Sequence, residues 1–271
     1  MKITKLKISL MTPFKTALRI VTDIKNLFAL ICIMLAITSY ADEKKILESR
    51  DHQQLIMVIT DNWQVDHGLL YTFEKNSNQW QLISKASVVT VGKNGLGWGL
   101  GLHNKQQGVY KKEGDGKAPA GIFTLGEAFG YLKSVNTGLS YQQMSANDYC
   151  IDVNGSPYYN QLVDQSKVGK AAVKGSSEPM RRDIHANGDI RYKKGFIVQH
   201  NPQNISKQGS CIFMHVWKAA GVPTSGCTAM EESVISRLLA WLNANKHPLY
   251  VALPRAQYQQ KKRTWGLPAL N

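Results

Sequence analysis

The sequence contains many short runs rich in Val, Ile, Thr and aromatic residues, separated by polar turn clusters, and such runs leave few alternatives to a β-rich fold. Side chains that alternate along these runs are typical of strands with one buried face. The first three runs lie close together and predict an antiparallel meander. The runs span residues 55–60, 68–75, 80–92, 196–200, 211–217 and 249–254. We therefore expect a mainly β fold with a few helices.

One segment, Thr228–Asn245, has the periodicity of an amphipathic helix instead. Its apolar residues form one wide stripe, made of Val234, Ile235, Leu238, Leu239, Trp241 and Leu242. Thr228 and Glu231 have the spacing of a capping box, in which two side chains satisfy free amides at a helix start. The pattern therefore predicts a helix that begins directly after Cys227 and ends before Pro248.

The middle of the chain has weaker patterns. Residues 92–126 are rich in glycine and loop-like up to Pro119. The stretch GLGWGLG at 95–101 lacks the preceding strand and following helix of a dinucleotide site, so we reject that interpretation. Residues 129–187 show little sustained periodicity. A long irregular segment of this kind is usually functional, and we expect it to form a wall or lid over a groove.

The N-terminal residues 1–41 resemble a secretory signal. Six basic residues precede an apolar run at 27–37, and Ser39-Tyr40-Ala41 is typical of a cleavage site. The predicted organisation is a signal peptide at 1–41, a short segment at 42–54, a catalytic domain at 55–254 and a loosely held polar tail at 255–271. The protein is thus expected to be periplasmic or exported, and to meet a membrane only if the signal stays uncleaved.

The charge of the chain is strongly basic. Its formal net charge is +14, and without residues 1–41 it is still +9, from 27 Lys and Arg against 18 Asp and Glu. A basic exported protein suits an anionic polymer as its partner. Nucleic acid would suit the charge as well, but the sequence has no helix-turn-helix, zinc-finger or aromatic sheet signature, so we expect no nucleic-acid partner.

The cysteines bear on both the compartment and the chemistry. Cys32 lies in the signal, which leaves Cys150, Cys211 and Cys227 in the mature chain. Three cysteines in an oxidising compartment leave at least one outside an intramolecular disulfide. We expect Cys150 and Cys211 to be able to pair and Cys227 to be free. The alternative for the first two is that they are reduced and buried.

Cys227 and His215 are the candidate catalytic pair. A helix start next to Cys227 would favour its thiolate, and an imidazole would take the proton. The amides around Gly226 and Cys227 would then stabilise an oxyanion. The competing interpretation is a structural cysteine. His200 is a second candidate, because it also follows a strand-like run, and the two runs are expected to be neighbours.

The residues of this site resemble a known family. His215 followed by Thr224-Ser225-Gly226-Cys227, in the stretch TSGCTAM, is similar to the active-site signature of the L,D-transpeptidase (YkuD-like) catalytic domain. The segment GDGKAPAGIFTLG at 114–126 resembles the Pro-x-Gly-x-Phe strand of that domain. The resemblance spans about 55–254 and implies a β-sandwich or barrel-type catalytic domain with a helix after the cysteine.

The resemblance also implies a reaction. Enzymes of this family cleave the bond between the L-centre of meso-diaminopimelate and a D-residue in a peptidoglycan stem peptide, through a thioester that an amine or water resolves. Cys227 matches the nucleophile, His215 the base, and Thr224, Ser225 and Gly226 the turn, with His200 as a possible supporting residue. Neither a metal nor another cofactor is implied.

Two departures leave the acceptor open. Ser225 stands where the family often has His, and Ala229 where it often has Arg or Asn. The GCTAM ending and the short spacing from His215 to Cys227 are closer to hydrolytic members. The alternatives are therefore cross-linking, exchange of D-amino acids, L,D-carboxypeptidase activity, or release of a wall-linked lipoprotein.

Three rival interpretations account for some of the same residues. A papain-like protease requires the opposite order of cysteine and histidine. A zinc site would use Cys211, His215, His200 and Cys227, although no compact ligand pair supports it. A secreted wall-binding module that is not an enzyme would explain the charge, but not a Gly-Cys turn beside a helix.

Overall fold

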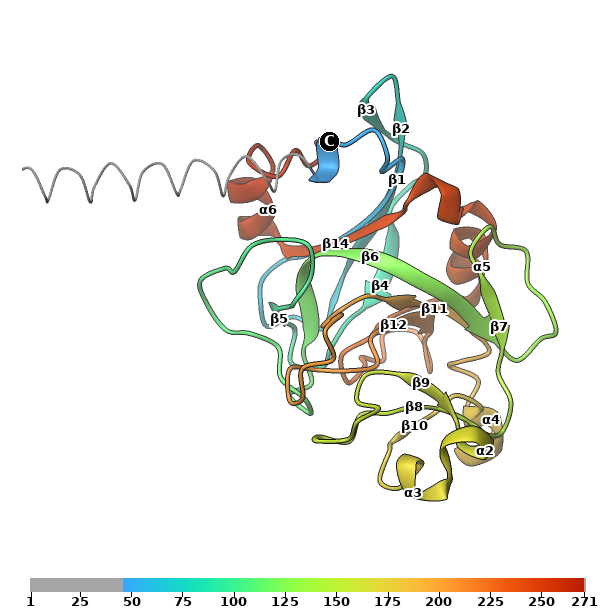
Figure 1. The fold of residues 1–271 in the computed structure, drawn as a ribbon. Helices are drawn as coiled ribbons and strands as arrows, with labels where there is room; N and C mark the ends of the chain where they lie inside the picture. Colours follow the sequence, from blue (N-terminus) through green and yellow to red (C-terminus); the bar gives the residue numbers. More distant parts are fainter. Residues whose placement is uncertain (1–45, 271) are drawn as a thin grey trace, which may run out of the picture. The chain divides into compact units, whose positions relative to one another are not determined.

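The computed structural model describes residues 46–270, and the fold is given for these residues. The chain forms one large sheet and one small sheet with few helices (Figure 1). The strands are β1 (Gln54–Thr60), β2 (His67–Asn76), β3 (Gln79–Leu82), β4 (Ser87–Thr90), β5 (Leu96–Trp98), β6 (Ala118–Gly130), β7 (Tyr141–Gln143), β8 (Asp148–Cys150), β9 (Leu162–Asp164), β10 (Glu178–Pro179), β11 (Lys194–Val198), β12 (Phe213–Val216), β13 (Thr228–Met230) and β14 (Leu249–Pro254). The helices are α2 (Gln165–Val168), α3 (Lys170–Val173), α4 (Arg182–His185), α5 (Glu232–Trp241), the 3-10 turn η1 (Ala244–Lys246) and α6 (Arg255–Lys261).

Eight strands of the large sheet close into a barrel. Their order is β1-β14-β6-β11-β12-β13-β4-β2, and β2 pairs back with β1. The short strands β3, β5 and β7 attach to its members, and β10-β8-β9 form the separate small sheet. The expected mainly β fold is confirmed. The predicted run at 80–92 is two strands, β3 and β4, because the turn at 83–86 interrupts it.

The apolar sequences of β1 and β14 account for the position of these two strands in the core. The two strands pair in parallel, and every residue of both is buried. Strands covered on both faces lose the polar alternation of a half-exposed strand. Here α6 packs against β14 and β1, while α5 packs against β11 and β12. The helices therefore cover strands whose other face lines the core.

The predicted start of the long helix is wrong. Thr228–Met230 form β13, which pairs in parallel with β12, and α5 begins at Glu232. The Thr228 hydroxyl lies 2.9 Å from the hydroxyl of Tyr250, and no side chain caps α5 at Glu231. Thr228 is fully enclosed in the sheet, so its side chain is not available to a helix amide. Cys227 therefore precedes a strand and has no helix dipole behind it.

The C-terminal segment also differs from the expectation. Residues 255–271 were expected to be a loosely held tail, but α6 occupies their first part. Tyr258 and Trp265 are buried, and the Trp265 ring stacks on that of His103. The apolar residues among the polar ones hold this segment to the fold.

The irregular segment 129–187 contains only short elements, β7 to β10 and α2 to α4. Its small sheet lies beside the large one, in the part of Figure 1 coloured yellow-green. The predicted signal at 1–41 lies outside the described residues. Within residues 46–270, no helix is both long and apolar enough to cross a membrane.

Candidate thiol site

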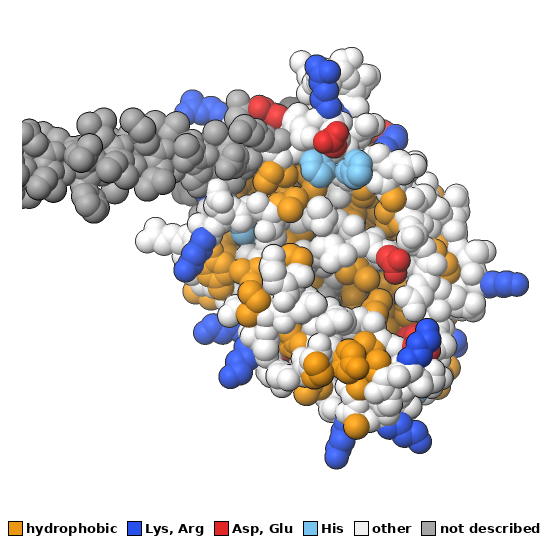
Figure 2. Space-filling model, viewed as in Figure 1, with side chains coloured by type: hydrophobic (Ala, Val, Ile, Leu, Met, Phe, Trp, Pro, Cys, Tyr) orange, Lys and Arg blue, Asp and Glu red, His pale blue; other side chains and the backbone are white. Residues whose placement is uncertain are grey.

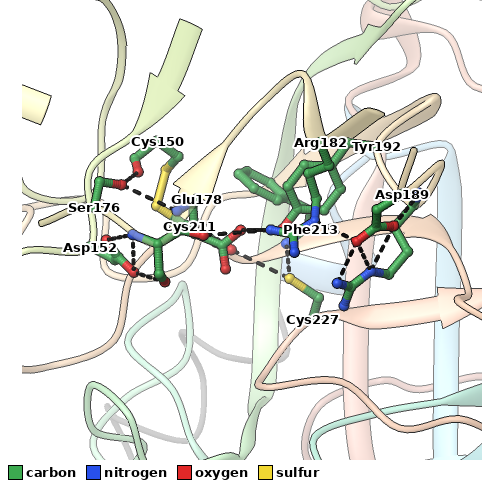
Figure 3. Close-up of polar contacts among 12 residues, drawn as sticks. Cys150, Asp152, Ser176, Glu178, Arg182, Asp189, Tyr192, Cys211, Phe213 and Cys227 are labelled. Atoms are coloured by element: carbon green, nitrogen blue, oxygen red, sulfur yellow. Dashed lines mark hydrogen bonds and ion pairs between the residues drawn. A yellow bond between two sulfur atoms is a disulfide. The ribbon is translucent and has the colours of Figure 1, made fainter. Parts of the chain in front are cut away.

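Cys227 is a buried thiol held by two backbone groups. It is 8% exposed and is the free cysteine of the described residues. Its Sγ accepts a hydrogen bond from the Phe213 amide at 3.3 Å, and its S–H donates to the Cys211 carbonyl at 3.4 Å (Figure 3). Because a carbonyl only accepts, this arrangement requires the protonated thiol.

The turn that carries the thiol is fixed by Thr224. The Thr224 hydroxyl donates to the Cys227 carbonyl at 2.6 Å and accepts from the Gly226 amide at 3.1 Å. The Thr224 amide donates in turn to the carbonyl of Val91, the residue directly after β4. The Gly226 amide is therefore occupied. Within residues 46–270 the Ser225 and Cys227 amides donate no hydrogen bond, so the amides of this turn that stay open to an oxyanion are those on either side of Gly226.

Gly226 permits a close approach of another segment. A Cβ at this position would lie 3.0 Å from the Lys117 carbonyl oxygen and 3.3 Å from the Nζ of Lys111. Only a residue without a side chain fits without displacing the neighbour. The glycine-rich segment predicted as loops thus packs directly against the Cys227 turn, while Ser225 remains exposed beside it.

His215 lies on β12 and is 3% exposed. Its Nδ1 is 2.7 Å from the carbonyl oxygen of Val216. A nitrogen that faces a carbonyl must carry the hydrogen, so Nε2 is the acceptor nitrogen of the neutral ring. Burial and, to a smaller degree, the Arg191 guanidinium lower the pKa of His215 to about 4. The ring is therefore neutral at pH 7 and able to accept a proton.

The strand register places His215 near the thiol. Met214 pairs with Thr228 and His215 with Ala229, so Cys227 falls one position before this pairing, level with Phe213. The ring of Tyr192 packs edge-on against His215, with 5.2 Å between centroids, and it shares a buried cluster with Cys227. Within the described part of the chain no hydrogen bond joins the imidazole to the thiol. Tyr192 thus lies between the two groups, contacting the His215 ring and sharing the buried cluster of Cys227, while His215 itself is not among the residues that line the Cys227 cavity.

His200 has a different role. β11 and β12 are neighbours, as expected, but they are antiparallel, with Gly195 opposite His215. The two histidines therefore sit at opposite ends of the strand pair. His200 Nδ1 accepts from the Leu100 amide at 3.2 Å, and its Nε2 lies 2.9 Å from the Gln208 carbonyl. Both ring nitrogens are used within the fold, which makes His200 a structural residue.

The pKa of the Cys227 thiol is raised, whereas a helix start beside it was expected to lower it. Burial, together with the Glu178 carboxylate, raises the pKa of the Cys227 thiol to about 12. The Phe213 amide and the Lys111 ammonium act in the other direction. The prediction of a lowered thiol pKa is therefore wrong for the resting protein, because no helix dipole reaches Cys227.

Cys227 lines a cavity of about 330 Å³. Charged and polar side chains from distant parts of the sequence surround it, namely Lys93, Lys111, Glu113, Asp152, Glu178 and Ser210, together with residues 225–227. Sequence reasoning missed the acidic residues, because Asp152 and Glu178 lie in the irregular segment without a pattern. That segment does border the cavity, as a wall would.

A disulfide forms part of the cavity wall. Cys150 and Cys211 are joined, with an S–S distance of 2.01 Å, in agreement with the pairing considered from the sequence. Cys211 has φ of 54°, a left-handed conformation, and its carbonyl receives the Cys227 S–H. The bond thus ties the small sheet to the backbone that holds the nucleophile candidate. It also removes Cys211 from the zinc alternative.

The Cys150–Cys211 disulfide also supports the expected export of the protein. Disulfides are typical of proteins exported to an oxidising environment. Lys and Arg side chains are spread around the face seen in Figure 2 and do not form one block.

The closed β fold and the buried thiol on the cavity wall define a β protein with a candidate cysteine site. Neither a family model nor a curated protein matches the sequence. Among solved structures, the chain is similar to Bd1075 of Bdellovibrio bacteriovorus, with 15% identity and a TM-score of 0.38 over 79% of this chain and 55% of that one. It is similar also to the helical cell shape determining protein Pgp2 of Campylobacter jejuni, with 14% identity and a TM-score of 0.35 over 79% and 55%. The chain spans just over half the length of each.

Proposed function

We propose that the protein is a cysteine acyltransferase that acts on peptidoglycan stem peptides by L,D-transpeptidase chemistry. The observation that carries the proposal is the free thiol of Cys227, which lines a cavity and directly precedes β13, the strand paired with the His215 strand β12. The substrate class rests on the resemblance of His215 and the TSGCTAM stretch to that family. The disulfide supports export of the protein, and peptidoglycan lies outside the cytoplasmic membrane.

The first half of the reaction forms a thioester. His215 Nε2 takes the proton of the Cys227 thiol, and the thiolate attacks the carbonyl carbon of the scissile amide. The negative charge that develops on the carbonyl oxygen is stabilised by the Cys227 amide. The C–N bond then breaks, and the leaving amine takes the proton from the imidazolium. The acyl group remains on Sγ.

The second half regenerates the thiol. An amine or a water molecule attacks the thioester carbonyl and gives its proton to His215, and the C–S bond breaks as Sγ is reprotonated. An amine acceptor yields a new amide, while water yields a carboxylic acid. The hydrolytic alternatives, L,D-carboxypeptidase activity or release of a wall-linked lipoprotein, differ from cross-linking only in this acceptor.

The test is covalent trapping on the full chain. Exposure to tetrapeptide stem peptides, or to a carbapenem as the donor mimic suggested by the family resemblance, should add one acyl group that maps to Cys227 by mass. Cys227→Ser should lose acyl transfer almost entirely, because a hydroxyl ionises far less readily than a thiol, and it should keep its melting temperature.

The products separate the alternatives. A new amide indicates transfer to an amine, and a tripeptide acid indicates hydrolysis. A Cys227→Ser protein with wild-type turnover, or an adduct on another residue, would show that the cysteine is structural. Binding of wall fragments without any adduct would favour the wall-binding module.

A further inference from the structure

Glu178 is a carboxylate on the wall of the Cys227 cavity. It opens β10, where it pairs with Cys150 of β8, next to the disulfide. Its Oε2 accepts from the Tyr192 hydroxyl at 2.5 Å and lies 3.6 Å from an Arg182 guanidinium nitrogen. About a fifth of its side chain, 20%, is exposed. The carboxylate is therefore held in place and still open to the cavity.

Its second oxygen distinguishes Glu178 from the other acidic groups of the cavity. Both oxygens of Glu113 accept hydrogen bonds, from Tyr159, Ser210 and the Gly114 amide. Both oxygens of Asp152 accept from Ser177. Within residues 46–270, Oε1 of Glu178 receives none. An open carboxylate oxygen in a partly enclosed cavity favours a charged donor, since charge-assisted hydrogen bonds are the stronger ones.

We propose that the Glu178 carboxylate is a subsite for an ammonium group of the substrate, beside the Cys227 thiol. The inference rests on the proposed function and deepens it. An ammonium group has two sources in such a reaction: the side chain of a diamino acid in the acyl donor, or the amine of the acceptor.

Occupation of the subsite has a consequence for the nucleophile. The Glu178 charge opposes ionisation of the Cys227 thiol. The other charged groups that face Glu178 are Arg182 and Arg191, which stabilise its anion, and Asp152, which opposes it. A bound ammonium group compensates the negative charge and thus favours the thiolate when substrate is present. The resting thiol stays protonated and protected from oxidation.

The first experiment compares free and N-acetylated amines. In the donor arm, the rate of Cys227 acylation is measured with stem peptides whose diamino-acid side chain is free or acetylated. In the acceptor arm, the share of the thioester that is resolved by a free amine is measured against the share resolved by water. We expect the wild type to favour the free amine by about tenfold or more in one of the two arms. The arm that shows the preference identifies the source. Equal rates in both arms overturn the proposal without the need for any variant.

Glu178→Gln keeps the size and the Tyr192 contact but removes the charge. The preference for the free amine should fall towards one in this variant. Asp152→Asn removes the same charge from the same cavity, but both Asp152 oxygens are already occupied, so it should retain the wild-type preference. A preference kept by Glu178→Gln, or lost equally in both variants, contradicts the assignment to Glu178.

A third measurement does not depend on peptidoglycan. The rate of Cys227 alkylation by iodoacetamide is measured with and without pentane-1,5-diamine. The diamine should speed alkylation of the wild type and leave Glu178→Gln unchanged. An equal response of both proteins overturns the subsite. If no stem peptide forms a thioester while the alkylation behaves as expected, the proposed function fails and the ammonium subsite stands.

Discussion

At the residue scale, the two buried histidines differ in the nitrogens they leave open. His200 uses both, whereas His215 uses Nδ1 for the Val216 carbonyl and directs the acceptor role to Nε2. A general base needs a free acceptor nitrogen and the neutral form. Burial keeps both rings neutral, with pKa values of about 4, but only His215 has an acceptor nitrogen that the fold does not use.

This difference predicts the effect of two matched variants. His215→Gln removes the base and should lower acyl transfer by about 10² to 10⁴-fold, the range of general acid–base catalysis. His200→Gln removes a buried ring of the same kind but no base, so its turnover per folded molecule should stay close to wild type. Steady-state rates are normalised to the folded fraction from circular dichroism. Equal losses in the two variants would exclude His215 as the specific base.

The residues of the candidate site were predictable in part. The sequence places Cys227 and His215 in a recognisable order, because both belong to one short stretch with a strand and a turn. Glu178 and Lys111 come from segments without periodicity, and only the folded chain brings them to the same cavity. The raised pKa of the Cys227 thiol could not be predicted either, because it depends on burial and on the carboxylate of Glu178, which is distant in the sequence.

At the element scale, the start of α5 shows why local pattern misled the prediction. Thr228 and Glu231 fit a capping box, but Thr228–Met230 complete the barrel between β12 and β4. Pairing on both sides satisfies the backbone of these residues better than the first turn of a helix would. Tertiary pairing therefore overrode a local signal, and the same pairing positions Cys227.

The C-terminal segment gives an element-scale prediction. Trp265 is 0% exposed and its ring contacts those of Trp98 and His103. Trp265→Ala should lower the free energy of unfolding by about 3 to 5 kcal/mol, as for other large aromatic truncations in cores. Lys262→Ala, at an exposed position of the same segment, should have almost no effect. Urea denaturation measures both, and equal stability of the two variants would mean that the segment is not part of the core.

At the scale of the whole molecule, the mainly β class of the fold was predictable from the sequence, but the closure of the large sheet into a barrel was not. Most strands of the barrel are visible in the sequence because their residue types are typical of strands, whereas β13 was predicted as the start of a helix and β6 was indicated only by the family resemblance. The parallel pairing of β1 with β14 joins the two ends of the domain, and no local pattern encodes it. The barrel therefore follows from burial of both apolar strands together.

The buried histidines make the stability of the whole domain depend on pH. His200 and His215 have pKa values of about 4 in the fold, against 6.5 for the exposed side chain. Below pH 6.5 the unfolded chain binds protons that the native protein does not, so the free energy of unfolding falls as the pH falls towards 4. Each histidine contributes roughly 3 kcal/mol to this loss.

Glu178 acts in the opposite direction, because burial raises its pKa from 4.5 to about 6. Between pH 6 and pH 4.5, proton uptake by native Glu178 offsets roughly 2 kcal/mol of the loss in the free energy of unfolding. The net expectation is a fall of roughly 3 to 5 kcal/mol between pH 7 and pH 4, which urea denaturation without reductant measures. His200→Gln should flatten the dependence and Glu178→Gln should steepen it. A domain equally stable at pH 7 and pH 4 would show that these histidines are not buried in their neutral form.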